Sequence, residues 1–134
     1  MQASITIPAD RAAPTAARRW VDDVARSPAD EVRDDLRLIV TELVTNAVKY
    51  GPGDPVHVCV HVRPPDIVRG IVIDRGEQGE AIRLRSPDPE ATGGRGLRIV
   101  HELARRWGVD AGSTHVWFVL DRDRPRSGRP RRRS

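Results

Sequence analysis

The stretch ELVTNAVKYG, residues 42–51, decides how the rest of the chain is interpreted. It places Glu42 and Asn46 four residues apart, and two residues at this spacing project from nearly the same face of a helix. A carboxylate and a carboxamide on one face can hold a hydrated magnesium ion and orient a hydroxyl group or a water molecule. The stretch therefore indicates chemistry on a phosphate group, although an isolated Glu-x-x-x-Asn pair also fits an ordinary solvated helix face.

Local patterns place this stretch at the end of a helix. Ser27 and Pro28 predict an N-cap followed by proline at the first helical position. The helix is expected to run to Tyr50, because Gly51 suits a left-handed C-terminal cap and Pro52 prevents continuation. Apolar residues at helical spacing define its buried stripe: Val32, Leu36, Ile39, Val40, Leu43 and Ala47.

The remaining chain divides into further short elements. An amphipathic helix is expected over 13–26 and another over 97–107, the latter with Leu97, Val100, Leu103 and Ala104 on one face. Alternating or apolar runs predict five strands, over 3–8, 55–63, 67–74, 107–112 and 114–121. The second and third strands should pair as an antiparallel hairpin, and residues 75–96 should form a long lid or binding loop. This order predicts a two-layer α/β (α+β) sandwich with a mostly antiparallel sheet and helices on one face.

Composition and charge narrow the class of protein. The chain has 134 residues, 38% hydrophobic and 31% charged, which fits one folded domain. We see no membrane span, no signal peptide and only Cys59, so a cytoplasmic protein is expected. Residues 121–134 hold seven of the 23 basic and two of the 19 acidic residues, which leaves a net charge of −1 in the first 120. Nucleic-acid binding is therefore not expected of the folded part, predicted as 1–121, and the basic tail 122–134 is expected to be disordered.

Three further motifs follow the helix in order. Asp74 ends an apolar strand and precedes Gly76, which fits either a turn or a pocket in which the carboxylate accepts a hydrogen bond from the adenine amine. The run GGRGLRIV, residues 93–100, offers unhindered N–H groups at a helix N-terminus, an arrangement that suits phosphate oxygens but is also frequent elsewhere. Thr114 leads into the last strand, where its hydroxyl could reach a nucleotide or simply lie in a turn.

Taken together, the four motifs resemble the GHKL superfamily of histidine-kinase-like ATPases. The similarity is strongest to its single-domain branch, the anti-sigma-factor serine/threonine kinases of GC-rich Gram-positive bacteria, and it covers roughly residues 3–121. The resemblance implies ATP and Mg²⁺ as cofactors, Glu42 as general base, Asn46 as magnesium ligand and Asp74 with Gly76 at the adenine. It also implies nucleotide contacts from Gly94, Gly96, Leu97 and Thr114, to which we add Lys49 and Arg95 as phosphate neighbours. The family often has Asp-x-Gly-x-Gly, whereas here the next glycine is Gly79.

The function that this resemblance implies is transfer of the ATP γ-phosphoryl group to a serine of an anti-anti-sigma protein. A sigma factor would be the sequestered partner, and a homodimer is suggested. Two alternatives stay open at this point. A non-catalytic ATP-binding regulatory module would have the same pocket, and the arginine-rich tail could drive nucleic-acid binding.

Histidine and cysteine residues gave weaker signals. His57, Cys59 and His61 share one strand face, but successive residues of one strand rarely converge on one metal ion, and a fourth ligand is missing. A structural role was therefore preferred for all three. No partner could be identified for His101 or His115.

Overall fold

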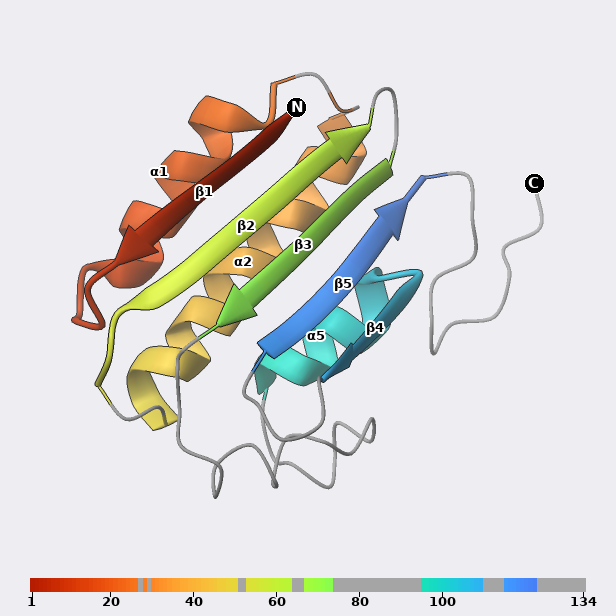
Figure 1. The fold of residues 1–134 in the computed structure, drawn as a ribbon. Helices are drawn as coiled ribbons and strands as arrows, with labels where there is room; N and C mark the ends of the chain where they lie inside the picture. Colours follow the sequence, from red (N-terminus) through yellow and green to blue (C-terminus); the bar gives the residue numbers. More distant parts are fainter. Residues whose placement is uncertain are drawn as a thin grey trace.

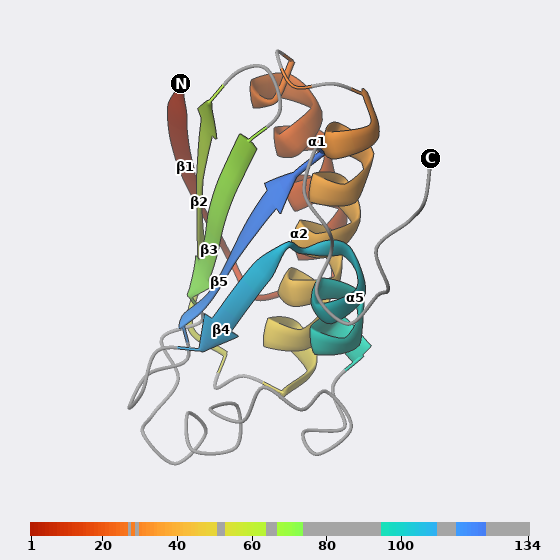
Figure 2. The same ribbon diagram turned by 90° about the vertical axis from the view of Figure 1, so that its right-hand side faces the viewer.

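The fold is a five-stranded antiparallel sheet with helices packed on one of its faces (Figures 1 and 2). The computed structural model describes residues 1–26, 28, 30–50, 53–63, 67–73, 95–109 and 115–122. Its strands are β1 (Gln2–Ile7), β2 (Val56–Arg63), β3 (Ile67–Ile73), β4 (Arg106–Val109) and β5 (His115–Asp121). Its helices are α1 (Ala13–Val24), α2 (Asp30–Tyr50) and α5 (Arg95–Leu103). The predicted fold class is confirmed.

The strands lie in the order β1-β2-β3-β5-β4, and every neighbouring pair is antiparallel. The predicted β2–β3 hairpin is confirmed, with Val58 opposite Val72. The chain then passes through α5 and the edge strand β4 before β5 returns to pair with β3. This return places the end of β3 beside the start of β5.

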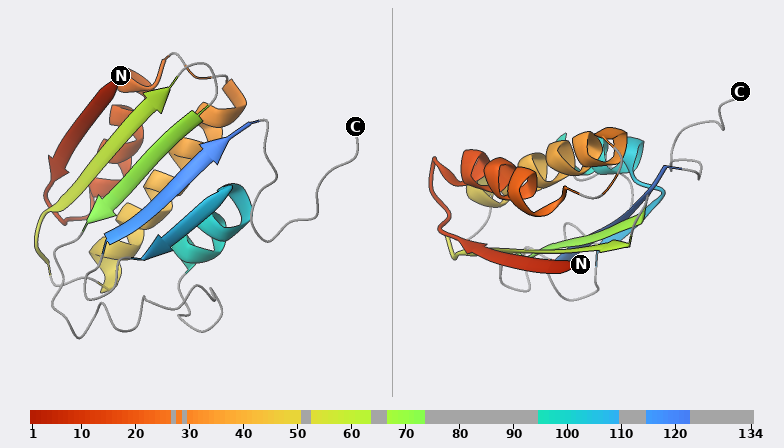
Figure 3. Two further views of the ribbon diagram at one scale, coloured as in Figure 1. Left: turned by 45° about the vertical axis from the view of Figure 1, so that its right-hand side comes forward. Right: turned by 90° about the horizontal axis from the view of Figure 1, so that it is seen from above.

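The core lies between the sheet and the three helices. Alternation along each strand turns one set of side chains toward the helices, and in β2 this set consists of four valines with 0–1% exposure. The predicted apolar stripe of α2 is buried throughout, together with Val44. Figure 3 (right) shows all three helices on the same side of the sheet. None of the described helices is both long and apolar enough to cross a membrane.

Four predicted helix boundaries differ from the structure. Helix α1 ends at Val24 rather than at residue 26, and α5 begins at Arg95 rather than at Leu97. Helix α2 begins at Asp30, two residues after Pro28, so proline is not its first residue, and Ser27 lies outside the described residues. Helix α5 ends at Leu103 rather than at Trp107. The Ala104 N–H still donates to the Val100 carbonyl at 2.8 Å, but the Arg105 N–H donates to Val119 in β5 at 2.8 Å. Pairing with β5 therefore ends the helix, although the local sequence favours its continuation.

The predicted lid, residues 75–96, falls almost entirely outside the described residues, which resume at Arg95. The predicted disordered tail also lies outside them, apart from Arg122. The division into a folded part and a tail therefore remains a prediction.

Candidate nucleotide-binding site

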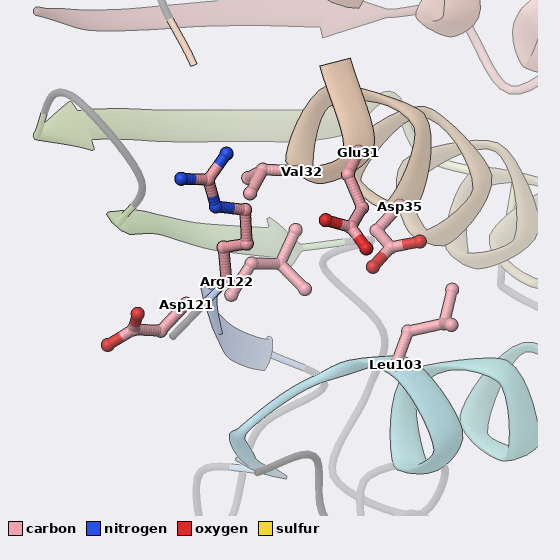
Figure 4. Close-up of a pocket in the computed structure, with 7 residues that line it drawn as sticks. Glu31, Val32, Asp35, Leu103, Asp121 and Arg122 are labelled. Carbon is pink, nitrogen blue, oxygen red and sulfur yellow. The ribbon is translucent and has the colours of Figure 1, made fainter. Parts of the chain in front are cut away.

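Glu42 and Asn46 lie on the flank of α2 that faces α5. Asp35 precedes Glu42 by seven residues and Asn46 by eleven, close to two and three full turns at 3.6 residues per turn, so the three side chains share one flank. Asp35 and Leu103 of α5 line one pocket, and Figure 4 shows Asp35 directed toward the space above Leu103. The opposite flank faces α1, because Arg37 pairs there with Asp22 at 2.8 Å. The predicted pair is thus directed along the α2–α5 boundary.

Both side chains are half-buried and available for a ligand. Within the described part of the chain, neither the Glu42 carboxylate nor the Asn46 carboxamide has a hydrogen-bond or ion-pair partner. The neighbouring hydroxyl groups are engaged locally, since Thr41 and Thr45 each donate to a backbone carbonyl four residues earlier at 2.7 Å. A half-buried carboxamide oxygen without a described partner fits a magnesium ligand, because Mg²⁺ needs only one or two protein oxygens when phosphates and water fill the other positions. Lys49, one turn further along, is exposed.

The sheet brings together the described residues that flank two of the other motifs. Ile73, the last residue of β3, lies opposite His115, the first residue of β5. Asp74 and Thr114 are bonded directly to this cross-strand pair, although both residues lie outside the described residues, as do Gly76 and Gly94. The structure therefore describes the flanking residues of these two motifs, and the position of Asp74 and Thr114 stays a prediction. Figures 1 and 2 show the last turn of α2 and the start of α5 at the same end.

The start of α5 carries the described part of the glycine-rich motif. Arg95 and Gly96 are its first two residues, and their backbone N–H groups belong to the turn in which helical N–H groups lack intrahelical partners. The Leu97 side chain is 1% exposed and belongs to the core. Leu97 can therefore contribute to a nucleotide site only through its backbone.

Two features of α2 and α5 were not predicted from the sequence. Asp35 shares the flank of Glu42, and the periodicity that linked Glu42 to Asn46 could have revealed it. The sequence did not identify a partner for His101, and in the structure the Trp107 indole N–H donates to His101 Nδ1 at 3.2 Å, with the two rings edge to face. No local pattern links these two residues, since the contact joins a helix to a strand.

One member of the histidine and cysteine row of β2 takes part in a contact between strands. His57 Nδ1 and the Thr6 hydroxyl of β1 form a hydrogen bond at 2.7 Å. Among the described residues, no group of three or more histidine, cysteine or acidic side chains could hold a metal ion. The side chain of His115 is outside the description.

The geometry defines an α+β domain in which one polar helix flank lies at the end of the sheet where the central strand β3 ends and β5 begins. The family model of the histidine kinase-like ATPase domain matches residues 7–120. The chain therefore belongs to the histidine kinase-like ATPase family, as its motifs predicted. A search of the curated proteins finds no significant match.

Among solved structures, the chain is similar to the crystal structure of the RsbU and RsbW domains of Rv1364c from Mycobacterium tuberculosis. The TM-score is 0.60 and the sequence identity 20%. The match covers 95% of this chain and 33% of the other, so this chain spans about a third of that protein's length. At this identity the likeness concerns the fold.

Proposed function

We propose that the chain binds Mg-ATP where α2 ends and α5 begins, and that it transfers the γ-phosphoryl group to a serine hydroxyl of a partner protein. The observation that carries the proposal is the shared α2 flank, which directs Glu42 and Asn46 together along the boundary with α5. Membership of an ATPase family supports ATP as the ligand.

Each residue has a defined task in this proposal. The Asn46 carboxamide oxygen would hold the magnesium ion, which neutralises phosphate charge when bound. Glu42 would accept the proton of the attacking hydroxyl, a role typically worth about 10²–10⁴ in rate. Asp74 and Gly76 would contact adenine, while Lys49, Arg95 and the backbone near Gly96 would contact phosphates. Phosphoryl transfer depends mainly on such positioning and charge neutralisation.

The biological role we propose is that of an anti-sigma-factor kinase acting in the cytoplasm. The motifs resemble that branch of the family, and the fold is similar to a structure that contains an RsbW domain. The substrate would be an anti-anti-sigma protein and the sequestered partner a sigma factor. A homodimer and a single ATP-binding domain over 1–121 belong to the same proposal.

Two measurements, made one after the other, test the proposal. Isothermal titration with ATP, with and without magnesium, should show magnesium-dependent binding. Labelled ATP should then phosphorylate a serine of a candidate anti-anti-sigma protein. Glu42→Gln should keep ATP affinity within about twofold and lower turnover at least 100-fold, the lower bound for a general base. Glu31→Gln is the matched control, because Glu31 lies at the exposed far end of α2.

The outcomes separate a kinase from a passive ATP-binding module. Binding without transfer would support the module. Equal turnover of Glu42→Gln and Glu31→Gln would remove Glu42 from the role of base. Absence of binding at millimolar ATP would contradict the nucleotide site itself.

A further inference from the structure

The face of the sheet that points away from the helices carries a defined pattern of side chains. The strand register shows which side chains lie on this face, because residues directly opposite each other on neighbouring strands point to the same side of a sheet. Val58, Val72 and Val116 are paired in one row and buried against the helices. The rows before and after it therefore point the other way. Within the described residues, no helix or strand covers this second face (Figure 3).

The centre of this open face is apolar. Cys59, Ile71 and Trp117 lie opposite one another in a single row, with Ile73 and Val119 beside them. All five side chains are half-buried, and none belongs to the core cluster.

Trp117 lies across the edge strand β4. A Cβ atom placed on Gly108 would come within 2.8 Å of its Cζ2 atom. Its indole therefore widens the apolar row toward the edge of the sheet.

The next row along the strands is basic. His61 lies opposite Arg69, and Val119 lies opposite both Arg69 and Arg106. All three basic side chains are exposed, as is Arg63 two residues beyond His61. Within the described part of the chain, Arg63, Arg69 and Arg106 have no ion-pair partner. Two residues of a strand span about 6.8 Å, which sets the separation of the apolar and basic rows.

We propose that this open face docks an acidic amphipathic helix of a partner protein. A helix is one of the elements that cover the apolar face of a sheet in folded domains. A helix lying across the strands would place its apolar stripe on the row of Cys59, Ile71 and Trp117. Arg69 and Arg106 are two strands apart, about 9.6 Å at 4.8 Å per strand. Carboxylates seven residues apart on a helix are separated by about 10.5 Å along its axis, which matches this spacing.

Charge and composition favour this occupant over others. The described charged side chains of the face are three arginines, Arg63, Arg69 and Arg106, and one aspartate, Asp121. The face therefore has a net positive charge, and two copies of it would repel each other. Nucleic acid binds open sheet faces by stacking bases on several aromatic rings. Among the described side chains here only Trp117 has a large aromatic ring, and the rest of the apolar row is not aromatic. The inference does not rest on the proposed nucleotide chemistry.

The test uses the whole chain and a designed probe. A fluorescein-labelled helical peptide of 14 residues carries leucines on one stripe and glutamates along one flank, and its twin carries lysines instead. The glutamate peptide should bind in an anisotropy titration and the lysine twin should not. Arg69→Glu should weaken binding at least tenfold. Arg19→Glu, the same change at an exposed position of α1, should alter binding less than twofold. Thermal unfolding checks that both variants fold.

A second readout locates the peptide. Cys59, the only cysteine, lies in the apolar row, so bound peptide should slow its reaction with a maleimide at least threefold. Equal affinity of Arg69→Glu and Arg19→Glu, or no binding of the glutamate peptide, overturns the proposal. Sedimentation of the free chain and titration with a 20-nucleotide single strand test the other occupants. A self-association or nucleic-acid affinity that Arg69→Glu abolishes would assign the face to a second copy or to nucleic acid and equally overturn it.

Discussion

Replacing Gly70 with alanine tests how tightly the central strands are packed. Gly70 lies in β3 between Val60 of β2 and Phe118 of β5, and it is buried. An added Cβ would lie 2.2 Å from Phe118 Cζ and 2.7 Å from Cε1 and Cε2. Carbon atoms pack at about 3.5 Å or more, so the ring would have to move by about 1.3 Å. Phe118 is 1% exposed, and the surrounding core leaves no room for that movement.

Overpacking of this kind typically costs about 1–3 kcal/mol, and the size of the clash places Gly70→Ala near 3 kcal/mol. For a chain of this length, this corresponds to a decrease in Tm of about 12 °C at about 4 °C per kcal/mol. Urea unfolding followed by circular dichroism measures the loss. Gly108→Ala is the matched control, because its Cβ meets the Trp117 ring at the open face, where the ring can move into solvent. It should cost less than about 1 kcal/mol.

A double-mutant cycle with Phe118→Leu assigns the cost to the ring. The shorter side chain removes the atoms that the new Cβ would meet, so the double variant should be at least about 1 kcal/mol more stable than additivity predicts. An additive cycle, or a Gly70→Ala loss below about 0.5 kcal/mol, would refute the packing argument.

Three further substitutions address the site and its support. Asn46→Ala should abolish the magnesium-dependent part of ATP affinity in calorimetry, and an unchanged magnesium effect would exclude this residue as ligand. Asp74→Asn should weaken ATP binding by about 10- to 100-fold, the value of a hydrogen bond to a charged group, and a change below twofold would contradict adenine recognition by this carboxylate. Trp107→Phe removes the hydrogen bond to His101 and should lower the free energy of unfolding by about 1 kcal/mol in urea titration; an unchanged value would mean that water replaces the indole without loss.

The sequence predicted those elements whose signals are local. Helix α2 and the β2–β3 hairpin follow from apolar periods of 3.6 and 2 residues. The end of α5 was not predictable in this way, because Leu103, Ala104 and Trp107 continue a helical pattern. The Arg105 N–H instead joins the sheet at Val119, a contact with a residue 14 positions later. Long-range pairing of this kind leaves no trace in the local pattern.

The candidate site shows the same division. Spacing alone placed Glu42 and Asn46 on one face, but it could not tell whether that face looks toward α1 or α5. The contacts of the two flanks of α2 decide between them. Arg37 on one flank pairs with α1, and Asp35 on the other lines a pocket with Leu103 of α5. The residues that flank the second and fourth motifs likewise come together only through the register between β3 and β5, which sets Ile73 opposite His115.

The alternation of side chains along β3 and β5 gives these two strands separate roles in the core, on the open face and at their ends. Val72 and Val116 are packed into the core, while Ile71 and Trp117 form the open face. The end of β3 and the start of β5 adjoin the second and fourth sequence motifs. Arg69 is four residues from Ile73, about 13.6 Å along the strand, which exceeds the Debye length of about 8 Å at physiological ionic strength. If the chain binds nucleotide and a partner as proposed, a charge on the open face would be screened from the nucleotide site. Partner docking would then act on nucleotide binding through displacement of the strands, which the tight fit of Phe118 against Gly70 opposes.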